Sequence, residues 1–182
     1  VMNGGVSDML FMTQDTVYRP KEIQMQLLAH TDTTSLRLET GDFFLDFKSE
    51  NGYEEILERM TCMFTMMEEQ FDRRVLAQDS LASVLPVMHL QLVSGRDNPI
   101  CNSLSMMGYS LEQLHLTLNT NPTMGVNGGG QLLGANLDGI ALDTIQSHIY
   151  QDSVGLKFDM RVCNGPKNKQ FIFDSRLLAY LT

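Results

Sequence analysis

The stretch that decides the predicted fold is residues 43–60, FFLDFKSENGYEEILERM, because the hydrophobic period changes inside it. Up to residue 48, apolar side chains alternate with others, which predicts a half-buried strand. From Asn51 onward the apolar spacing becomes three to four residues, and Glu54 follows Asn51 at the distance of an approximate capping box. We therefore predict an amphipathic helix from Asn51 to about Gln78, preceded by a strand.

Period-two alternation recurs on both sides of this helix. It predicts strands over 23–29, 36–38, 88–92, 114–118 and 154–162. Residues 140–150 fit either a short helix or an irregular strand. The turn Asn164-Gly165-Pro166, with Phe171 opening the return strand, predicts a C-terminal β-hairpin. The predicted class is α+β: a mainly antiparallel sheet or sandwich, one long amphipathic helix packed on one side, and this hairpin.

The domain organisation follows from where the alternation fails. Residues 1–20 alternate poorly and are predicted to form an N-terminal arm, followed by a single α+β domain over 21–182. Within that domain, 94–110 and 119–139 are rich in Gly, Asn and Ser and are predicted to be long loops. Loops of this length inside a compact domain are uncommon unless they bind something.

Composition and charge exclude several classes of protein. The hydrophobic fraction of 43% is too high for a disordered chain, yet no apolar run is long enough to span a membrane. The net charge of −9, with scattered lysines, argues against duplex nucleic acid as a partner. The first residues lack the pattern of a secretory signal, and three dispersed cysteines favour a reducing compartment. We expect a cytoplasmic or virion location and no membrane contact.

The chemistry-bearing residues form no recognised catalytic or metal-binding pattern. No Gly-Lys occurs, so a phosphate-binding P-loop is excluded. His30, His89 and His115 fall on the polar sides of predicted strands without the spacing of a zinc site. Cys62 falls on or near the apolar stripe of the helix, where a thiol is expected to be inert. We predict no catalytic residue, no cofactor and no metal, and expect that the protein is not an enzyme.

These features favour a structural subunit of a large homo- or hetero-oligomeric assembly. The apolar arm, the two long loops and the 13 methionines would gain order against copies of the chain and other assembly proteins. The element order is loosely similar to that of tube-forming proteins of bacteriophage tails, a similarity that implies a particle component of tube, shell or baseplate type. The predicted interface residues are Met9, Leu10, Phe11, Met12, Asn98, Pro99, Met124 and Val126.

An alternative remains open at the level of sequence. The loops at 94–110 and 119–139 would also suit the roof of a pocket in an enzyme or small-molecule-binding domain. The polar groups available to such a pocket are His89, His115, Arg96 and Asp97.

Overall fold

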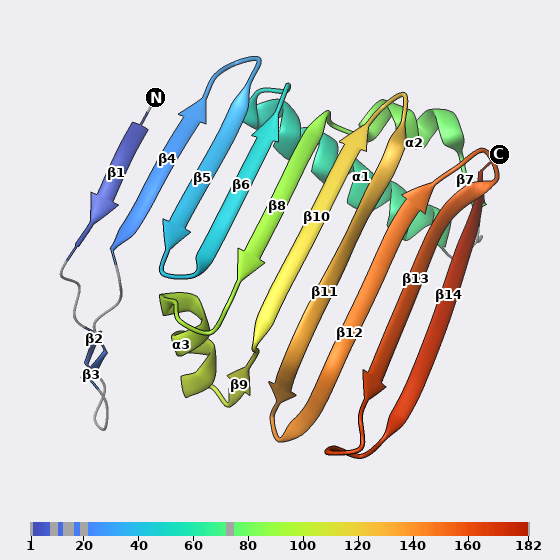
Figure 1. Cartoon of the computed structure of the whole chain (residues 1–182). Coiled ribbons are helices and arrows are strands. Elements are labelled where there is room, and N and C mark those ends of the chain that lie inside the picture. The colour runs from blue at the N-terminus through green and yellow to red at the C-terminus, as the bar shows by residue number, and fades with distance from the viewer. Residues whose placement is uncertain (1, 8–10, 13–16, 19–21, 72–74, 182) are drawn as a thin grey trace.

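A single antiparallel sheet dominates the computed structural model, which describes residues 2–7, 11–12, 17–18, 22–71 and 75–181 (Figure 1). Among these residues twelve strands belong to the large sheet, and β2 and β3 form a separate pair. The strands are β1 (Met2–Val6), β2 (Phe11–Met12), β3 (Val17–Tyr18), β4 (Ile23–Ala29), β5 (Thr34–Thr40), β6 (Phe43–Ser49), β7 (Val75–Leu76), β8 (Met88–Ser94), β9 (Tyr109–Ser110), β10 (Gln113–Asn121), β11 (Gly125–Leu137), β12 (Ile140–Gln151), β13 (Gly155–Asn164) and β14 (Phe171–Leu181). The helices are α1 (Tyr53–Phe71), α2 (Gln78–Val84) and α3 (Pro99–Met106).

The large sheet is an antiparallel meander from β1 to β14. Its order is β1-β4-β5-β6-β8-β10-β11-β12-β13-β14, so nearly every strand lies beside the next long strand in the chain. The short strand β7 pairs in parallel with the last two residues of β14, and β9 pairs with β11. Figure 1 shows β1 and β14 at opposite sides of the sheet.

The two faces of the sheet differ in chemistry, because directly paired residues of antiparallel strands lie on the same face. One register row crosses ten strands on the face that we name the apolar face. It consists of Met2, Leu27, Leu36, Phe47, Leu90, Leu118, Gly128, Ile149, Phe158 and Leu177. The neighbouring row lies on the opposite, polar face. It consists of Asn3, Gln26, Arg37, Asp46, Gln91, Thr117, Gly129, His148, Asp159 and Arg176.

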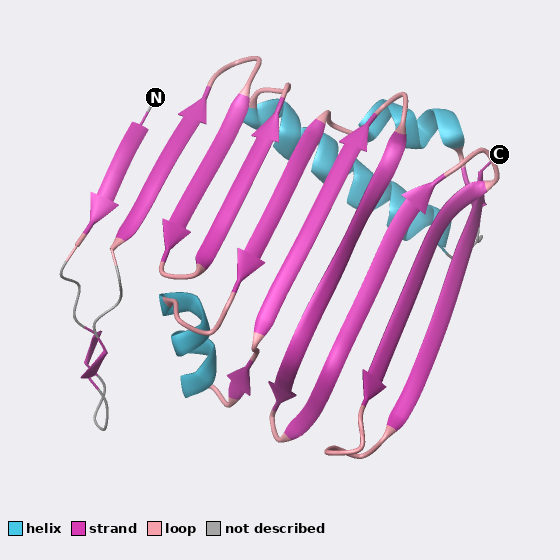
Figure 2. Cartoon of the chain, viewed as in Figure 1, coloured by secondary structure: helices cyan, strands magenta, loops and turns pink. Residues whose placement is uncertain are grey.

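The helices α1 and α2 pack on part of the apolar face (Figure 2). Met66 of α1 and Leu81 of α2 form a buried cluster with Leu85 and Val126, against which strand residues such as Leu118 also pack. Arg59 joins the two helical segments, since its guanidinium donates hydrogen bonds to the carbonyls of Ser83 and Leu85.

The helix α3 is fixed to one end of the sheet by Asn98. The side chain of Asn98 accepts a hydrogen bond from the backbone N–H of Cys101, which makes it the N-cap, and Pro99 occupies the first turn. Its amide Nδ2 donates to Asp42 Oδ1 at 2.8 Å, and to Ser94 Oγ and Gly95 O at 3.0 Å each.

The predicted α+β class is wrong. Most of the described residues lie in strands and far fewer in helices, of which the described ranges hold three short ones, and the long strands form one sheet rather than a sandwich. The expected helix over 51–78 ends at Phe71 and is followed by β7 and α2. Its apolar side chains do not form one buried stripe, because Leu57 is 64% exposed and Phe64 is 62% exposed.

The two predicted long loops are also wrong. Residues 94–110 contain α3 and β9, and residues 119–139 contain the hairpin between β10 and β11. Residues 140–150, which fitted either a helix or a strand, belong to β12. The predicted arm over 1–20 needs correction as well, because its residues 2–6 form β1 and pair with β4.

Candidate functional surfaces

The apolar face of the sheet is only partly covered by the helices of its own chain. Within the described ranges, seven apolar side chains are buried, and of these Phe43 and Val126 lie on the apolar face of the long strands. Most other apolar residues of that face are half-buried. On β14, Phe173 is 51% exposed and Leu177 is 57% exposed. The face therefore extends well beyond the part that α1 and α2 cover.

The accessible surface of the whole chain is also larger than expected for a compact monomer. Its accessible surface is 11898 Å², whereas a compact monomer of this mass is expected to expose roughly 8,800 Å². The whole chain therefore exposes about 3,000 Å² more than a compact monomer of its mass. A surface of that size with an apolar face is typical of a protein that buries it against another molecule.

The polar face carries charges that pair with one another. Its five cations each lie beside a carboxylate. The pairs are Arg37 with Glu39, Lys48 with Asp46, Lys157 with Asp152, Arg161 with Asp174, and Arg176 with Asp159. Two of these pairs join directly opposed residues of β13 and β14, a geometry in which opposite charges stabilise a sheet by about 0.2–1 kcal/mol. The face is polar but close to electrically balanced.

The hydrogen bonds within these pairs shift the pKa values of the partners. Asp152 has a lowered pKa, chiefly because the Lys157 ammonium donates to it and also because the N–H groups of Val154 and Gly155 do. The pKa of Lys157 is raised by the same contact. The pKa of Arg176 is raised by its hydrogen bond to Asp159, whose Oδ1 lies 2.7 Å from Nε. Each shift favours the charged form at neutral pH.

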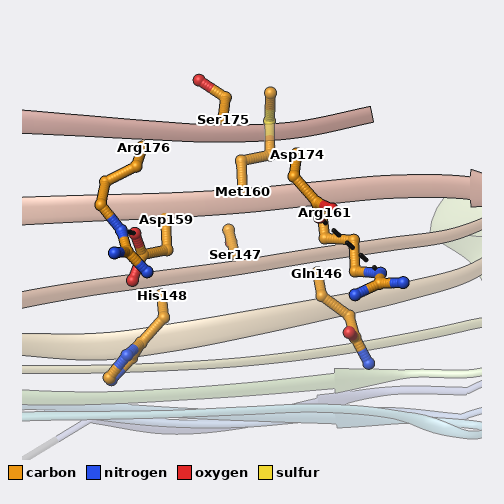
Figure 3. A pocket seen from close by; sticks show the side chains of 9 residues that line it. All are labelled: Gln146, Ser147, His148, Asp159, Met160, Arg161, Asp174, Ser175 and Arg176. Atoms are coloured by element: carbon orange, nitrogen blue, oxygen red, sulfur yellow. Dashed lines mark hydrogen bonds and ion pairs between the residues drawn. The ribbon is translucent and has the colours of Figure 1, made fainter. Parts of the chain in front are cut away.

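A shallow hollow of about 560 Å³ lies over β12, β13 and β14 (Figure 3). Figure 3 shows His148 and Gln146 directed to one side of the ribbons, and Ser175 and Met160 to the other. The two arginines in the hollow already contact Asp159 and Asp174, so an anionic ligand would compete with both carboxylates. The arrangement therefore offers an ordinary charged strand surface rather than a built ligand site.

The histidines considered at the level of sequence do not converge. In the pairing of β8 with β10, His89 lies opposite Asn119 and His115 lies opposite Val93. The two imidazoles are thus offset by four residues, or roughly 13 Å along the strands. Nδ1 of His89 is hydrogen-bonded to Asn119 Oδ1 at 2.6 Å. Among the described residues no group of three or more His, Cys, Asp and Glu side chains is arranged to hold a metal ion.

The segments predicted to roof a pocket border a second hollow, of about 370 Å³. Its lining includes Arg96, Cys101 and Glu112, and the two charged side chains form an ion pair with each other. Asp97 lies outside this lining, with its backbone N–H donating to Asp42 Oδ2. Cys101 is buried, and its thiol contacts Ser94 Oγ at 3.3 Å. Cys62, expected on or near the apolar stripe of the helix, is instead exposed.

The predicted interface residues are not brought together. Met9 and Leu10 lie outside the described residues, and Phe11 and Met12 form β2, paired with β3. Asn98 and Val126 are used inside the chain, the first as the fully buried cap of α3 and the second in the core beneath the helices. Pro99 is half-buried in the first turn of α3. Met124, at the β10–β11 turn, is 81% exposed.

Two features of the surface were missed at the level of sequence. One is the length of the sheet edge at β14, and the other is a stripe on the outer side of α1. Tyr53, Leu57 and Phe64 are spaced to lie on one helical face, and all three are exposed. The signal was present in the helical pattern, because α1 has apolar residues around more than half of its circumference.

Comparison with known proteins identifies no relative. No family model, no curated protein and no solved structure matches this chain. No helix in the part of the chain that the structure describes is long and apolar enough to cross a membrane.

Proposed function

We propose that this chain is a structural subunit of a large homo-oligomeric assembly. The observation that carries the proposal is the partly uncovered apolar face, in a chain whose whole accessible surface is about 3,000 Å² above that of a compact monomer. Packing against neighbouring subunits removes this face from water, which is the main favourable contribution to most protein association.

The chemistry of the two faces supports a subunit that forms part of a ring, tube or shell rather than one that binds a small ligand. One face is apolar across ten strands, and the other is polar with its charges paired. A sheet of this kind suits the wall of a ring, tube or shell, in which one side contacts other protein and the other meets water. The setting we propose is a particle component of tube or shell type, in the cytoplasm or in a virion. The balanced charge of the polar face supports the absence of duplex nucleic acid among its direct ligands.

The proposal is tested by a pair of matched charge substitutions. Leu177→Glu places a carboxylate on the exposed part of the apolar face, and Gln26→Glu places one on the polar face. Both sites are exposed, so both variants are expected to fold with the circular dichroism spectrum of the wild type. In sedimentation velocity, the wild type and Gln26→Glu should sediment as oligomers, while Leu177→Glu should need at least a tenfold higher concentration to do so. Equal sedimentation of both variants as oligomers would show that the apolar face is not the contact.

A further inference from the structure

The two outer long strands of the sheet are complementary to each other. On its inner side β14 pairs with β13 along its whole length. On its outer side, among the described residues, only Tyr180 and Leu181 are paired, with β7. Within the part of the chain that the structure describes, no strand pairs with the outward-facing backbone groups of residues 171–179. Such an edge is a template for a strand of another chain.

The side chains of residues 171–179 make this edge a favourable template. Protected edge strands carry lysine, proline or bulges, whereas β14 exposes Phe173 and Leu177 on the apolar face and Ile172 on the other. Its two charged residues, Asp174 and Arg176, are held by partners on β13. The edge is long, apolar and regular.

We infer that β14 of one copy pairs with β1 of a second copy, so that the sheets of successive subunits join edge to edge. This inference rests on the proposed function and adds an edge contact to the packing of the apolar face. β1 is the strand at the opposite edge, all five of its residues are exposed, and five residues fit within the stretch 171–179.

The number of strands fixes how the two edges meet. The meander from β1 to β14 has ten strands, and each neighbouring pair is antiparallel. Because ten is even, β1 and β14 run in opposite directions. A second copy placed beside the first in the same orientation therefore presents β1 antiparallel to β14. Figure 1 shows these opposite directions in the arrows of the two strands.

The same arrangement continues both faces. On β1, Met2, Gly4 and Val6 lie on the apolar face, and Asn3 and Gly5 lie on the polar face. When the pleats of the two strands match, Met2, Gly4 and Val6 lie beside the apolar side chains of β14. Asn3 and Gly5 then lie beside Asp174 and Arg176 on the polar face. No atom lies within 4 Å of a Cβ built on Gly4. This space can receive a large side chain of β14, as aromatic residues cover edge glycines in sheets.

A join between two different edges is heterologous and repeats from copy to copy. It produces a closed ring where the rotation between copies closes, and an open filament where it does not. A join between two β14 strands would instead be isologous, would stop at a dimer, and would leave β1 open. Either join can be antiparallel with matched faces, but only the first also pairs the exposed edge of β1 and fills the space beside Gly4.

Cysteine cross-linking tests the contact directly. Within one chain, β1 and β14 are separated by nine strand spacings, or about 43 Å in a flat sheet, far beyond the reach of a disulfide. Any bond between them therefore joins two copies. In a Cys62→Ser, Cys163→Ala background, Gly4→Cys is combined in turn with Phe173→Cys, Ser175→Cys or Leu177→Cys, three residues on the apolar face of β14.

After oxidation with copper phenanthroline, at least one of these pairs should give a covalent ladder of dimers, trimers and higher species. Gly4→Cys alone should give none. Asn3→Cys with Ser175→Cys is the matched control, because these two side chains point to opposite faces, and it should give none. Sedimentation velocity before oxidation checks that each variant still assembles.

The outcomes separate this contact from the proposed function. Cross-linking of a β14 variant alone would show the isologous join and overturn the inference. An oligomer without a ladder in any of the three pairs would overturn the inference and leave the assembly role standing. A monomer at every concentration would contradict both.

Discussion

Replacing Asn98 by alanine tests the internal account of the fold, because this side chain is fully buried and all its polar atoms are used. Its Oδ1 accepts from the N–H of Cys101 at 2.9 Å, and its Nδ2 donates to Asp42, Ser94 and Gly95. Asn98→Ala removes every one of these bonds at once and leaves the buried N–H of Cys101 without its acceptor.

The magnitude can be worked from these contacts. Loss of an N-cap costs about 1 kcal/mol. Loss of a hydrogen bond to a charged acceptor such as Asp42 costs about 2 kcal/mol. Asn98→Ala should therefore lower the free energy of unfolding by about 3 kcal/mol, which for a chain of this length lowers Tm by about 6–12 °C. Thermal unfolding followed by circular dichroism at one fixed protein concentration measures the shift.

Two further variants isolate the cause. Asn102→Ala changes the same residue type in the same helix without touching the cap, and should shift the free energy of unfolding by less than about 0.5 kcal/mol. Asn98→Asp keeps the acceptor for Cys101 but sets a second carboxylate against Asp42, so it should be at least as destabilising as alanine at pH 7. Its deficit should shrink as pH falls, because a protonated carboxyl regains a donor. An Asn98→Asp protein as stable as the wild type at pH 7 would refute the role assigned to the amide.

Three other substitutions test separate parts of the structure. Gly128→Ala should lower the free energy of unfolding by about 1–3 kcal/mol, since a Cβ there would lie 2.6 Å from a backbone oxygen. Gly129→Ala should lower it less, because the nearest oxygen is 3.3 Å away. Urea titration of both variants measures the difference. Within the described ranges, Oε1 of Gln151 is buried without a hydrogen-bond partner. Gln151→Met should therefore raise the free energy of unfolding by about 1 kcal/mol. A lower free energy of unfolding would show that this oxygen accepts a hydrogen bond in the wild type. Asp152→Asn should lower Tm at pH 7, where the carboxylate held by Lys157 is charged. The difference in Tm from the wild type should vanish as pH falls below 3.8 through the lowered pKa of Asp152. A difference in Tm that does not depend on pH would contradict this.

The strands were predictable one by one because alternation reports which side of a strand is apolar. Ile23–Ala29 and Gly155–Asn164 alternate clearly and form β4 and β13. Alternation cannot report what covers the apolar side, and the chain was therefore expected to enclose its own core beneath one helix. The structure instead spreads the apolar side over a sheet that is too wide for its helices to cover.

The errors at the two expected loops have local causes. Asn98 and Pro99 look like a helix breaker, yet an N-cap followed by proline at the first helical position also starts a helix, as it does in α3. The run Gly128-Gly129-Gly130 looks like a flexible turn. In β11 it lies within a strand, where Gly128 leaves room for the neighbouring backbone carbonyl of Thr117. The start of α3 was therefore signalled locally, whereas β11 depends on pairing with β10 and β12, which no short stretch of sequence reveals.

The native mass of the wild-type chain tests the central claim most directly. The claim is that other copies cover the apolar face, so native mass spectrometry or mass photometry should find multiples of 20.5 kDa. The multiples should grow with concentration or close at a fixed ring size. A single species of 20.5 kDa at every concentration, with no dye bound by its apolar face, would contradict the account.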